Sequence, residues 1–242
     1  MQEGYVDIHC HLLPGVDDGS PSMEVTREMM RMAYCDGIRS IIFTPHVRRP
    51  WLDITNDEIQ LVYEQIEEQA KQIADDLVLY LGSEIYYSHE LMEEYVHKIR
   101  PIQGTAYVLV EFSPDISFSE MIQAFTDVRN LGYEIILAHI ERYGCLRENI
   151  GNVEHLYDMG VLLQVNASTI TKPMDREHKK FMKHVLKEEL IHFIATDAHG
   201  VEHRRPEMKD AVRLVAKKYG ETYAQALSSG NAQRVLQGEI LL

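Results

Sequence analysis

The sequence predicts an α/β fold in which parallel strands close into a distorted seven-stranded (β/α) barrel. Seven short apolar runs, rich in β-branched residues, alternate along the chain with amphipathic stretches of helical period. Gly37, Gly132 and Gly160 each stand just before the next apolar run, at the place of a helix C-cap. The alternative is an open, doubly wound sheet, which is disfavoured because no Gly-rich phosphate loop follows the first run.

The predicted strands are short and apolar, as expected of strands buried in a parallel sheet. In chain order they are Tyr5–Ile8, Ser40–Thr44, Val78–Gly82, Ala106–Val110, Glu134–Ala138, Val161–Val165 and His192–Thr196. Helices are predicted between and after them, near residues 22–36, 56–76, 88–99, 117–131, 147–159, 175–189 and 206–219. Right-handed crossovers give all strands one direction, so their carboxyl ends meet on the face where the site of such a fold lies.

Length and composition predict a single domain spanning residues 1–242, because 45% of the residues are apolar and supply one sizeable core. No apolar stretch reaches the roughly 18 residues that a membrane helix requires. The start, Met1 to His11, lacks the basic and apolar regions of a signal peptide. We therefore expect a cytoplasmic protein without membrane insertion. The net charge of −14 repels nucleic acid, which argues against a nuclease acting on long DNA.

The cysteines do not supply the chemistry. Three of them, Cys10, Cys35 and Cys145, are too few and too irregularly spaced for a disulfide framework. Cysteine-dependent phosphatases pair their nucleophile with an arginine of the same phosphate-binding loop. The positions six residues after the three cysteines hold Val16, Ile41 and Gly151, so a thiolate nucleophile is disfavoured.

A polar or ionisable side chain follows every predicted strand. In chain order these residues are His9, His11, Asp17 and Asp18, then His46, Glu84, Glu111, His139 with Glu141, Asn166, and finally Asp197 with His199. One histidine at a strand end is usually structural, but seven strand ends of this kind indicate a shared site. Imidazole and carboxylate together suit zinc, manganese or iron. No thiolate cluster indicates a structural zinc site.

The spacing of these residues strengthens the prediction. Residues i and i+2 of a strand face the same way, so His9 and His11 converge, as do Asp197 and His199. Cys10 then points toward the outer helices, as a small buried apolar residue. A centrally placed carboxylate such as that of Glu84 is able to bridge two ions.

Arginines follow two of the candidate ligands. Arg142 lies three residues after His139, and Arg204 and Arg205 follow His199. Guanidinium groups beside metal ions suit the peripheral oxygens of a phosphoryl group, although a surface salt bridge is the alternative for each of them. The residues by themselves thus predict metal-assisted hydrolysis of a phosphomonoester.

Five segments of the chain resemble the PHP (polymerase and histidinol phosphatase) superfamily: Asp7–Gly19, Thr44–His46, Gly82–Glu84, Ala138–Tyr143 and Thr196–His199. The first of them continues into Pro-Gly-Val-Asp-Asp-Gly, which resembles one branch of that superfamily. This branch contains bacterial metal-dependent protein-tyrosine phosphatases of capsule and exopolysaccharide operons. The resemblance runs from residue 7 to about residue 205, and residues 206–242 carry no motif.

The resemblance implies a barrel of PHP type with three divalent ions at the carboxyl ends of the strands, manganese being favoured and iron or zinc possible. It assigns a first ion to His9, His11, Glu84 and Asp197, a second to Glu84, Glu111 and His139, and a third to Asp18, His46 and His199. It assigns Arg142 and Arg204 to the phosphate. A shift of one residue would exchange Asp18 for Asp17, or Arg204 for Arg205, so these two alternatives stay open.

The resemblance also implies a partner, a bacterial tyrosine kinase whose tyrosine-rich C-terminal tail carries phosphotyrosine. Its dephosphorylation would regulate capsule and exopolysaccharide synthesis. One alternative is a histidinol phosphatase or another small-molecule phosphomonoesterase of the superfamily. The small cationic substrate of histidinol phosphatase requires a closed pocket with carboxylates. A second alternative is a non-catalytic binding module, against which the complete set of ligands argues.

Overall fold

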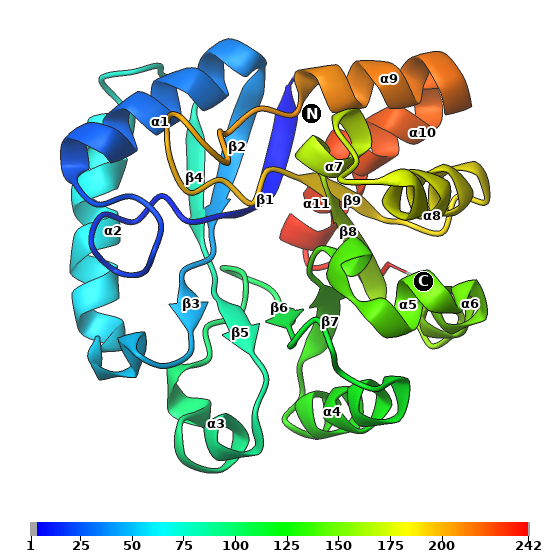
Figure 1. Cartoon of the computed structure of the whole chain (residues 1–242). Helices are drawn as coiled ribbons and strands as arrows, with labels where there is room; N and C mark the ends of the chain where they lie inside the picture. The colour runs from blue at the N-terminus through cyan, green and yellow to red at the C-terminus, as the bar shows by residue number, and fades with distance from the viewer. Residues whose placement is uncertain (1–3, 242) are drawn as a thin grey trace.

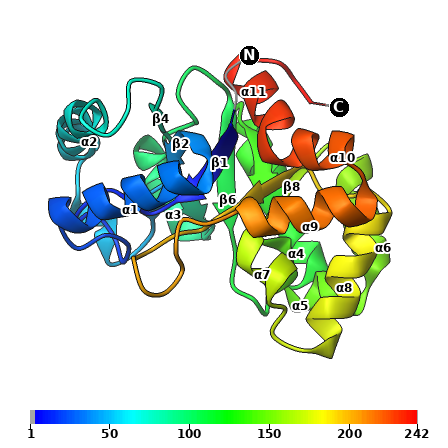
Figure 2. The same cartoon turned by 90° about the horizontal axis from the view of Figure 1, so that it is seen from above.

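Parallel strands form the centre of the protein, and helices cover them from the outside (Figure 1 and Figure 2). The computed structural model describes residues 4–241, so residues 1–3 and 242 of the predicted domain lie outside the described part. One sheet has the strand order β1-β2-β4 and the other the order β3-β5-β6-β7-β8-β9. All neighbouring strands in both sheets are parallel, which confirms the predicted α/β fold with parallel strands.

The strands, in chain order, are β1 (Tyr5–Cys10), β2 (Ile38–Phe43), β3 (His46–Val47), β4 (Val78–Leu81), β5 (Glu84–Tyr86), β6 (Tyr107–Glu111), β7 (Glu134–Leu137), β8 (Leu162–Asn166) and β9 (Phe193–Ala195). Each of the seven predicted runs overlaps one of them. The two strands that were not predicted, β3 and β5, have two and three residues, which is too short to show a periodicity in the sequence.

The two additional strands continue β2 and β4 after short interruptions. Pro45 lies between β2 and β3, and a proline has no N–H to donate to a strand ladder. Gly82 and Ser83 lie between β4 and β5. Hydrogen bonds span both interruptions, from Gly82 N to Phe43 O (2.8 Å) and from Glu84 N to Pro45 O (3.1 Å). The candidate ligands His46 and Glu84 therefore lie in β3 and β5, just beyond the ends of the second and third predicted strands.

The first and the last strand lie side by side. Cys10 and Ala198 form a parallel bridge. Asp197 N donates a hydrogen bond to His9 O (2.8 Å), and His11 N donates one to Ala198 O (2.9 Å). The strand series thus returns to its beginning, and motifs from opposite ends of the sequence meet.

The longer helices are α1 (Met23–Asp36), α2 (Asn56–Ala70), α4 (Phe118–Asn130), α6 (Ile150–Asp158), α8 (Arg176–Lys187) and α9 (Lys209–Tyr219). The short helices are α3 (His89–Glu94), α5 (Gly144–Glu148), α7 (Ala167–Thr171), α10 (Glu221–Gln225) and α11 (Asn231–Leu236), with the turns η1 (Trp51–Asp53), η2 (Val96–Lys98), η3 (Ile140–Arg142) and the π-helical η4 (Ala226–Gly230). Every predicted helical stretch contains a helix, whereas α7, α10, η4 and α11 were not predicted. None of the helices in residues 4–241 has the length and hydrophobicity required to cross a membrane.

Capping residues explain where several helices begin and end. The Thr55 hydroxyl accepts a hydrogen bond from Glu58 N, and the Glu58 carboxylate accepts one from Thr55 N, which forms a capping box at the start of α2. Ser117 and Glu120 form the same motif at the start of α4. Left-handed backbone, which glycine adopts at little steric cost, follows three helices at the predicted positions: Gly37 (φ 103°), Gly132 (φ 87°) and Gly160 (φ 72°).

The buried apolar residues form an inner cluster among the strands and an outer cluster between strands and helices. Along β6, Tyr107 and Leu109 belong to the inner cluster, and Val108 and Val110 to the outer one. Alternation of this kind is expected of strands whose two faces are both covered. The same alternation continues to the carboxyl ends of the strands, where it determines which side chains point into the site.

Strand β1 breaks this alternation next to the site. Ile8 belongs to the inner cluster but Cys10 belongs to the outer one, although a regular strand would place both on one face. The β1–β2 register shifts between Asp7 and Cys10. The irregularity is a β-bulge or equivalent distortion, and such features re-aim side chains near functional sites. The thiol of Cys10 donates to Ile42 O (3.4 Å), so it points away from the site as predicted.

A histidine far from the candidate ligands makes the fold sensitive to pH. His192 precedes β9, and its Nδ1 accepts a hydrogen bond from Leu163 N (3.0 Å). Its ring stacks on Tyr157, with 5.2 Å between the ring centroids. Burial lowers the pKa of His192 to about 4, because the charged imidazolium would lose its hydration there.

We predict that the contribution of His192 to the free energy of unfolding of the metal-free protein decreases as the pH falls from about 6.5 to about 4. A histidine of the unfolded chain takes up its proton near pH 6.5, whereas His192 of the folded protein does so near pH 4, so protons favour unfolding in this window. The full contribution is about 3 kcal/mol. Urea unfolding at both ends of the window measures it. His192→Asn keeps an acceptor but does not titrate, so its stability should depend less on pH. An equal dependence in both proteins would contradict the assignment.

Candidate metal centre

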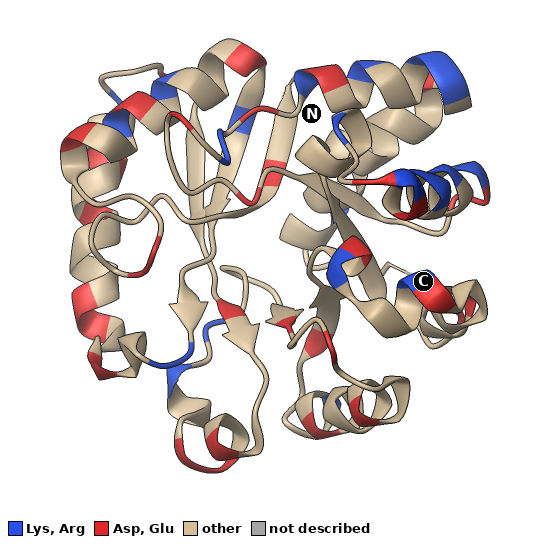
Figure 3. Ribbon diagram, viewed as in Figure 1, with Lys and Arg blue, Asp and Glu red and all other residues tan. Residues whose placement is uncertain are grey.

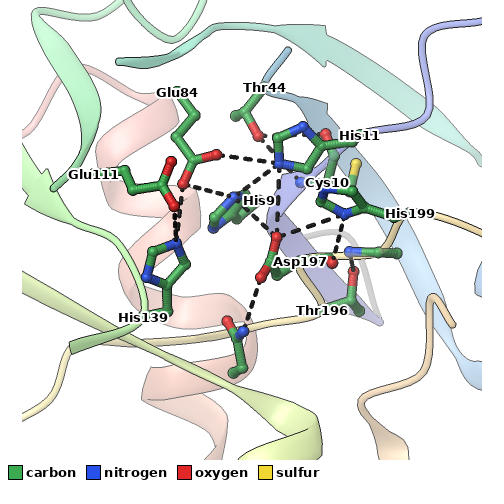
Figure 4. Close-up of polar contacts among 12 residues, drawn as sticks. His9, Cys10, His11, Thr44, Glu84, Glu111, His139, Thr196, Asp197 and His199 are labelled. Carbon is green, nitrogen blue, oxygen red and sulfur yellow. Dashed lines mark hydrogen bonds and ion pairs between the residues drawn. The ribbon is translucent and has the colours of Figure 1, made fainter. Parts of the chain in front are cut away.

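The nine predicted ligands come together at the carboxyl ends of the strands. Strands or the loops directly after them supply all of these residues: His9, His11, Asp18, His46, Glu84, Glu111, His139, Asp197 and His199. Figure 4 shows most of them pointing toward one another. Most are buried, whereas the side chain of Asp18 is 42% exposed and marks the solvent side of the cluster.

Three groups of ligand atoms are compact enough to hold a cation. The atoms of each group lie within 4.8 Å of one another, and the groups are His9 with His11 and Glu84, His46 with Glu84 and Glu111, and His11 with Asp18, His46 and His199. Glu84 belongs to two groups, as expected of a bridging carboxylate. His139 was predicted beside Glu84 and Glu111, and its Nε2 lies 3.1 Å from Glu84 Oε1 and 3.5 Å from Glu111 Oε1. The compact group around these two carboxylates contains His46 in its place.

Asp197 connects the histidines with two arginines. Its Oδ1 lies 3.4 Å from His9 Nε2 and 3.6 Å from His11 Nε2. Both of its oxygens also form short ion pairs, Oδ2 with Arg142 and Oδ1 with Arg204. The two arginines therefore reach one carboxylate from different loops.

The structure distinguishes between the members of the two pairs of neighbouring residues whose roles the sequence left open. Arg204 reaches the cluster, whereas Arg205 pairs with Glu207 at 2.7 Å. Asp18 Oδ1 lies 3.4 Å from His46 Nε2 and 3.6 Å from His199 Nε2. Arg204 and Asp18 are thus the members of each pair that face the predicted ligands.

Asp17 instead supports the cluster from behind. Its Oδ2 accepts hydrogen bonds from His11 Nδ1 (2.7 Å) and His46 N (3.0 Å), and its Oδ1 accepts one from Gly19 N (3.0 Å). The positively charged partners hold the pKa of Asp17 well below its usual range despite its burial. A Cβ at Gly19 would lie 2.0 Å from His11 O, so this turn requires glycine.

Hydrogen bonds fix which ring nitrogen three of the histidines turn toward the cluster. The Nδ1 atoms of His9, His11 and His199 donate to Gln164 Oε1 (3.2 Å), Asp17 Oδ2 (2.7 Å) and Asp197 O (3.0 Å). Once the proton of Nε2 is displaced, each Nε2 acts as an acceptor toward the cluster, which is the form that binds a metal ion. The carboxylates and carbonyls behind metal-binding histidines serve this purpose in general.

Gln164 was missed in the sequence. It lies in β8 two residues before Asn166, and its Oε1 also accepts a hydrogen bond from His139 N (2.8 Å). Its Nε2 donates to Asn166 Oδ1 (2.9 Å), and Asn166 Nδ2 donates to Asp197 Oδ2 (2.9 Å). A glutamine spaced by two from a strand-end asparagine in an apolar run was the available signal, because both side chains then face inward.

The backbone is strained at three residues of the site. His139 (φ 33°), Asp197 (φ 52°) and Arg204 (φ 47°) have left-handed backbone, and among the described residues Glu189 is the one other residue besides glycine that does. Such conformations cost of order 1–3 kcal/mol each and concentrate at functional sites. At each of these three residues the left-handed backbone turns the side chain, which is that of a candidate ligand or an arginine, toward the cluster.

The cluster has an unusual electrostatic balance. Burial lowers the pKa of His11, but the carboxylates of Asp17 and Glu84 outweigh burial and raise it to about 10. Burial and Arg142 lower the pKa of His139, but Glu111 and Glu84 raise it to about 9. The pKa values of Glu84 and Asp197 are held well below their usual range, because nearby positive groups outweigh burial. The carboxylates thus attract positive charge strongly, whether it is carried by protons, arginines or metal ions.

Several buried polar atoms of the cluster lack a hydrogen-bond partner. They are Glu84 Oε2, Glu111 Oε2, His46 Nδ1 and His199 Nε2, and the contact of His46 Nδ1 with Glu84 Oε2 at 3.0 Å is an ion pair without hydrogen-bond geometry. Leaving such atoms unsatisfied is costly, so their convergence in one place calls for a ligand. Buried carboxylate and imidazole atoms with free lone pairs fit divalent metal ions, and the donor types suit manganese, iron or zinc.

Two further side chains at the cluster define its chemistry. Burial first, and then nearby carboxylates, raise the pKa of the Cys10 thiol well above its usual value, so it is no nucleophile. Arg48 lies at the opening, with Nη2 3.6 Å from Asp18 Oδ2 and Nη1 3.7 Å from Glu111 Oε2. Arg48 was missed in the sequence, although its position two residues after His46 was a signal of the kind used for Arg142.

Comparison with known proteins agrees with this architecture. A solved structure described as YwqE from *Bacillus subtilis* and CpsB from *Streptococcus pneumoniae*, metal-dependent tyrosine phosphatases, superimposes with a TM-score of 0.86 at 29% identity, covering 98% of this chain and 96% of that one. A histidinol phosphate phosphatase from *Lactococcus lactis* shares the fold, with a TM-score of 0.59 at 18% identity over 90% of this chain and 94% of that one.

The sequence comparisons are more specific. The tyrosine-protein phosphatase CpsB of *Streptococcus pneumoniae* is 34% identical over 242 residues, which cover 98% of this chain and 100% of the relative. A family model described as capsular polysaccharide synthesis, CpsB/CapC, matches residues 5–237. That match takes in every strand and every candidate ligand of the site, and with it the chain belongs to the CpsB/CapC family of capsular polysaccharide synthesis.

Proposed function

We propose that this protein is a metal-dependent protein-tyrosine phosphatase that dephosphorylates a bacterial tyrosine kinase controlling capsule or exopolysaccharide synthesis. The observation that carries the proposal is the buried cluster of histidines and carboxylates with two arginines on Asp197. Membership of the CpsB/CapC family supports it, because relatives are named tyrosine-protein phosphatases. The substrate would be the tyrosine-rich C-terminal tail of that kinase. The reaction would take place in the cytoplasm, where ATP is available to the kinase.

The proposal includes the architecture of the site. We regard β2 with β3, and β4 with β5, as two interrupted strands, so that the single domain is a distorted barrel of seven strand units. The bridge between Cys10 and Ala198 supports its closure. The nine predicted ligands would hold up to three divalent ions, with manganese favoured.

The reaction proposed is direct hydrolysis of the phosphate ester. Divalent ions, when bound, supply Lewis acidity that lowers the pKa of water toward 7 and polarises phosphoryl oxygens. Arg142 and Arg204 would bind the peripheral oxygens as their charge grows. Asp17 and Gln164 would keep the histidines in the tautomer that binds cations. A phenolate leaves readily, so a strong general acid is not required.

A panel assay tests the proposal. The protein, loaded with Mn²⁺, is offered a phosphotyrosine peptide, a phosphoserine peptide and histidinol phosphate. We predict preferential hydrolysis of the phosphotyrosine peptide, loss of activity on exhaustive chelation, and recovery when the metal is returned. Preference for histidinol phosphate would favour the small-molecule alternative. Full activity of the chelated protein would refute a metal-dependent mechanism.

A second prediction separates phosphate binding from metal binding. Arginine does not ligate cations, so Arg142→Ala and Arg204→Ala should keep the metal content, whereas Asp197→Ala should reduce it. Each arginine loss should lower kcat by about 10²–10³-fold, as removal of one transition-state donor does. Metal analysis and steady-state kinetics on the phosphotyrosine peptide provide the measurements.

Arg205→Ala is the matched control. Arg205 pairs with Glu207 on the surface, so this variant should keep nearly full activity. Loss of activity in Arg205→Ala but not in Arg204→Ala would show that the arginine assignment is shifted by one residue. Full kcat in both Arg142→Ala and Arg204→Ala, with the metals retained, would remove the arginines from the mechanism.

A further inference from the structure

A cation between two aromatic rings lies at the opening of the ligand cluster. The guanidinium carbon of Arg48 is 5.1 Å from the centroid of the Trp51 ring and 5.6 Å from that of the Tyr86 ring. Its nitrogens reach Asp18 and Glu111 at 3.6 and 3.7 Å. We call Arg48, Trp51 and Tyr86 the mouth cluster. All three are partly exposed, so they are available to a molecule that enters the site.

One ring packs against a predicted ligand, and the other shares a strand with one. The Trp51 ring stacks on His46, with centroids 5.7 Å apart and 13° between the ring planes. The turn η1 that holds Trp51 is anchored by the buried Leu52. Tyr86 is the last residue of β5, two residues after Glu84. The two rings are therefore held in fixed positions relative to the site.

A hollow lies beside Tyr86, and its lining combines aromatic with polar and acidic side chains. A cavity of about 450 Å³ begins at Tyr86 and is lined by Tyr87, Phe112 and Ile116 among others. Its room beside the mouth cluster is suited to a neighbouring residue of a peptide. Helix α4, on which Figure 3 shows acidic residues, supplies Glu120 to the same lining.

We propose that the mouth cluster binds the aromatic ring of the phosphorylated residue and selects phosphotyrosine over alkyl phosphates. The inference rests on the proposed phosphatase function. In phosphotyrosine the ring is bonded directly to the ester oxygen, so a phosphate held by the ligands and arginines places the ring at the opening. Aromatic pairs and cation–π contacts stabilise it there. Phosphoserine has no ring, and histidinol phosphate has an alkyl ester oxygen, so neither places an aromatic ring at this distance from the phosphorus.

Trp51 makes the binding step visible without catalysis, because it is the one tryptophan of the chain. The probe is a peptide with phosphonodifluoromethyl-phenylalanine, which cannot be hydrolysed, and the ringless controls are methylphosphonate and inorganic phosphate. In the Mn²⁺-loaded protein we expect a saturable change of Trp51 fluorescence with the aryl phosphonate and a far smaller one with the controls. Equal responses to all three would overturn the proposal.

Variants test the contribution of each ring. Calorimetry should show that Trp51→Leu and Tyr86→Leu weaken binding of the aryl phosphonate peptide about tenfold, which corresponds to about 1.4 kcal/mol. Binding of inorganic phosphate and metal content should stay unchanged. Trp51→Phe should restore most of the affinity because it keeps an aromatic face. Tyr87→Phe is the control: the Tyr87 hydroxyl bonds Asp127 (2.6 Å), away from Arg48.

The outcomes separate this inference from the proposed function. Equal weakening of phosphate and aryl phosphonate in both leucine variants would assign the rings to ligand positioning and overturn the subsite. If the protein hydrolyses phosphotyrosine efficiently but both leucine variants bind the aryl phosphonate peptide as tightly as the unmodified protein, the subsite alone would be overturned. Ring-dependent binding without hydrolysis of any phosphate ester would support the subsite and refute the phosphatase.

Discussion

The structure of the site depends on how the free-energy cost of burying carboxylates is offset. Glu84 and Asp197 are almost fully buried, and an uncompensated charge in such a place is prohibitively unfavourable. Four histidines and two arginines beside the carboxylates hold their pKa values low. The same buried negative charge raises the pKa values of His11 and His139, and it favours divalent cations at this place for the same electrostatic reason. Compensation of buried negative charge therefore links the stability of the fold to its chemistry.

The fold makes this arrangement possible because it brings the first and the last strand of the chain together. The contact of β1 with the residues after β9 places His9 and His11 beside Asp197. The irregularity in β1 turns both histidines inward while Cys10 joins the outer core. Left-handed backbone at His139 and Asp197 aims these side chains into the cluster at a conformational cost. Packing of the two apolar clusters offsets that cost, so a rigid scaffold holds a strained site.

Much of this could be predicted from the sequence because apolar periodicity and strand-end polarity are local signals. They located all seven strand runs, and the spacing of His9 and His11 predicted their convergence. What escaped prediction depends on contacts between distant segments. Gln164 became meaningful only beside His9 and His139, and the short strands β3 and β5 are defined by their neighbours. The presence of His46 beside Glu84 and Glu111 likewise depends on how the β2–β3 interruption bends the chain.

If the histidines and carboxylates at the strand ends hold catalytic metal ions, those ions should be visible among them in a crystal. Anomalous diffraction at the manganese edge, from crystals grown with Mn²⁺ and phosphate, tests it most directly. We expect anomalous peaks at about 2.0–2.3 Å from ligand atoms of the cluster, with Glu84 shared between two ions. Phosphate should lie between those ions and the guanidinium groups of Arg142 and Arg204. A cluster without anomalous density, in crystals of a protein that remains active in the same Mn²⁺ buffer, would contradict it.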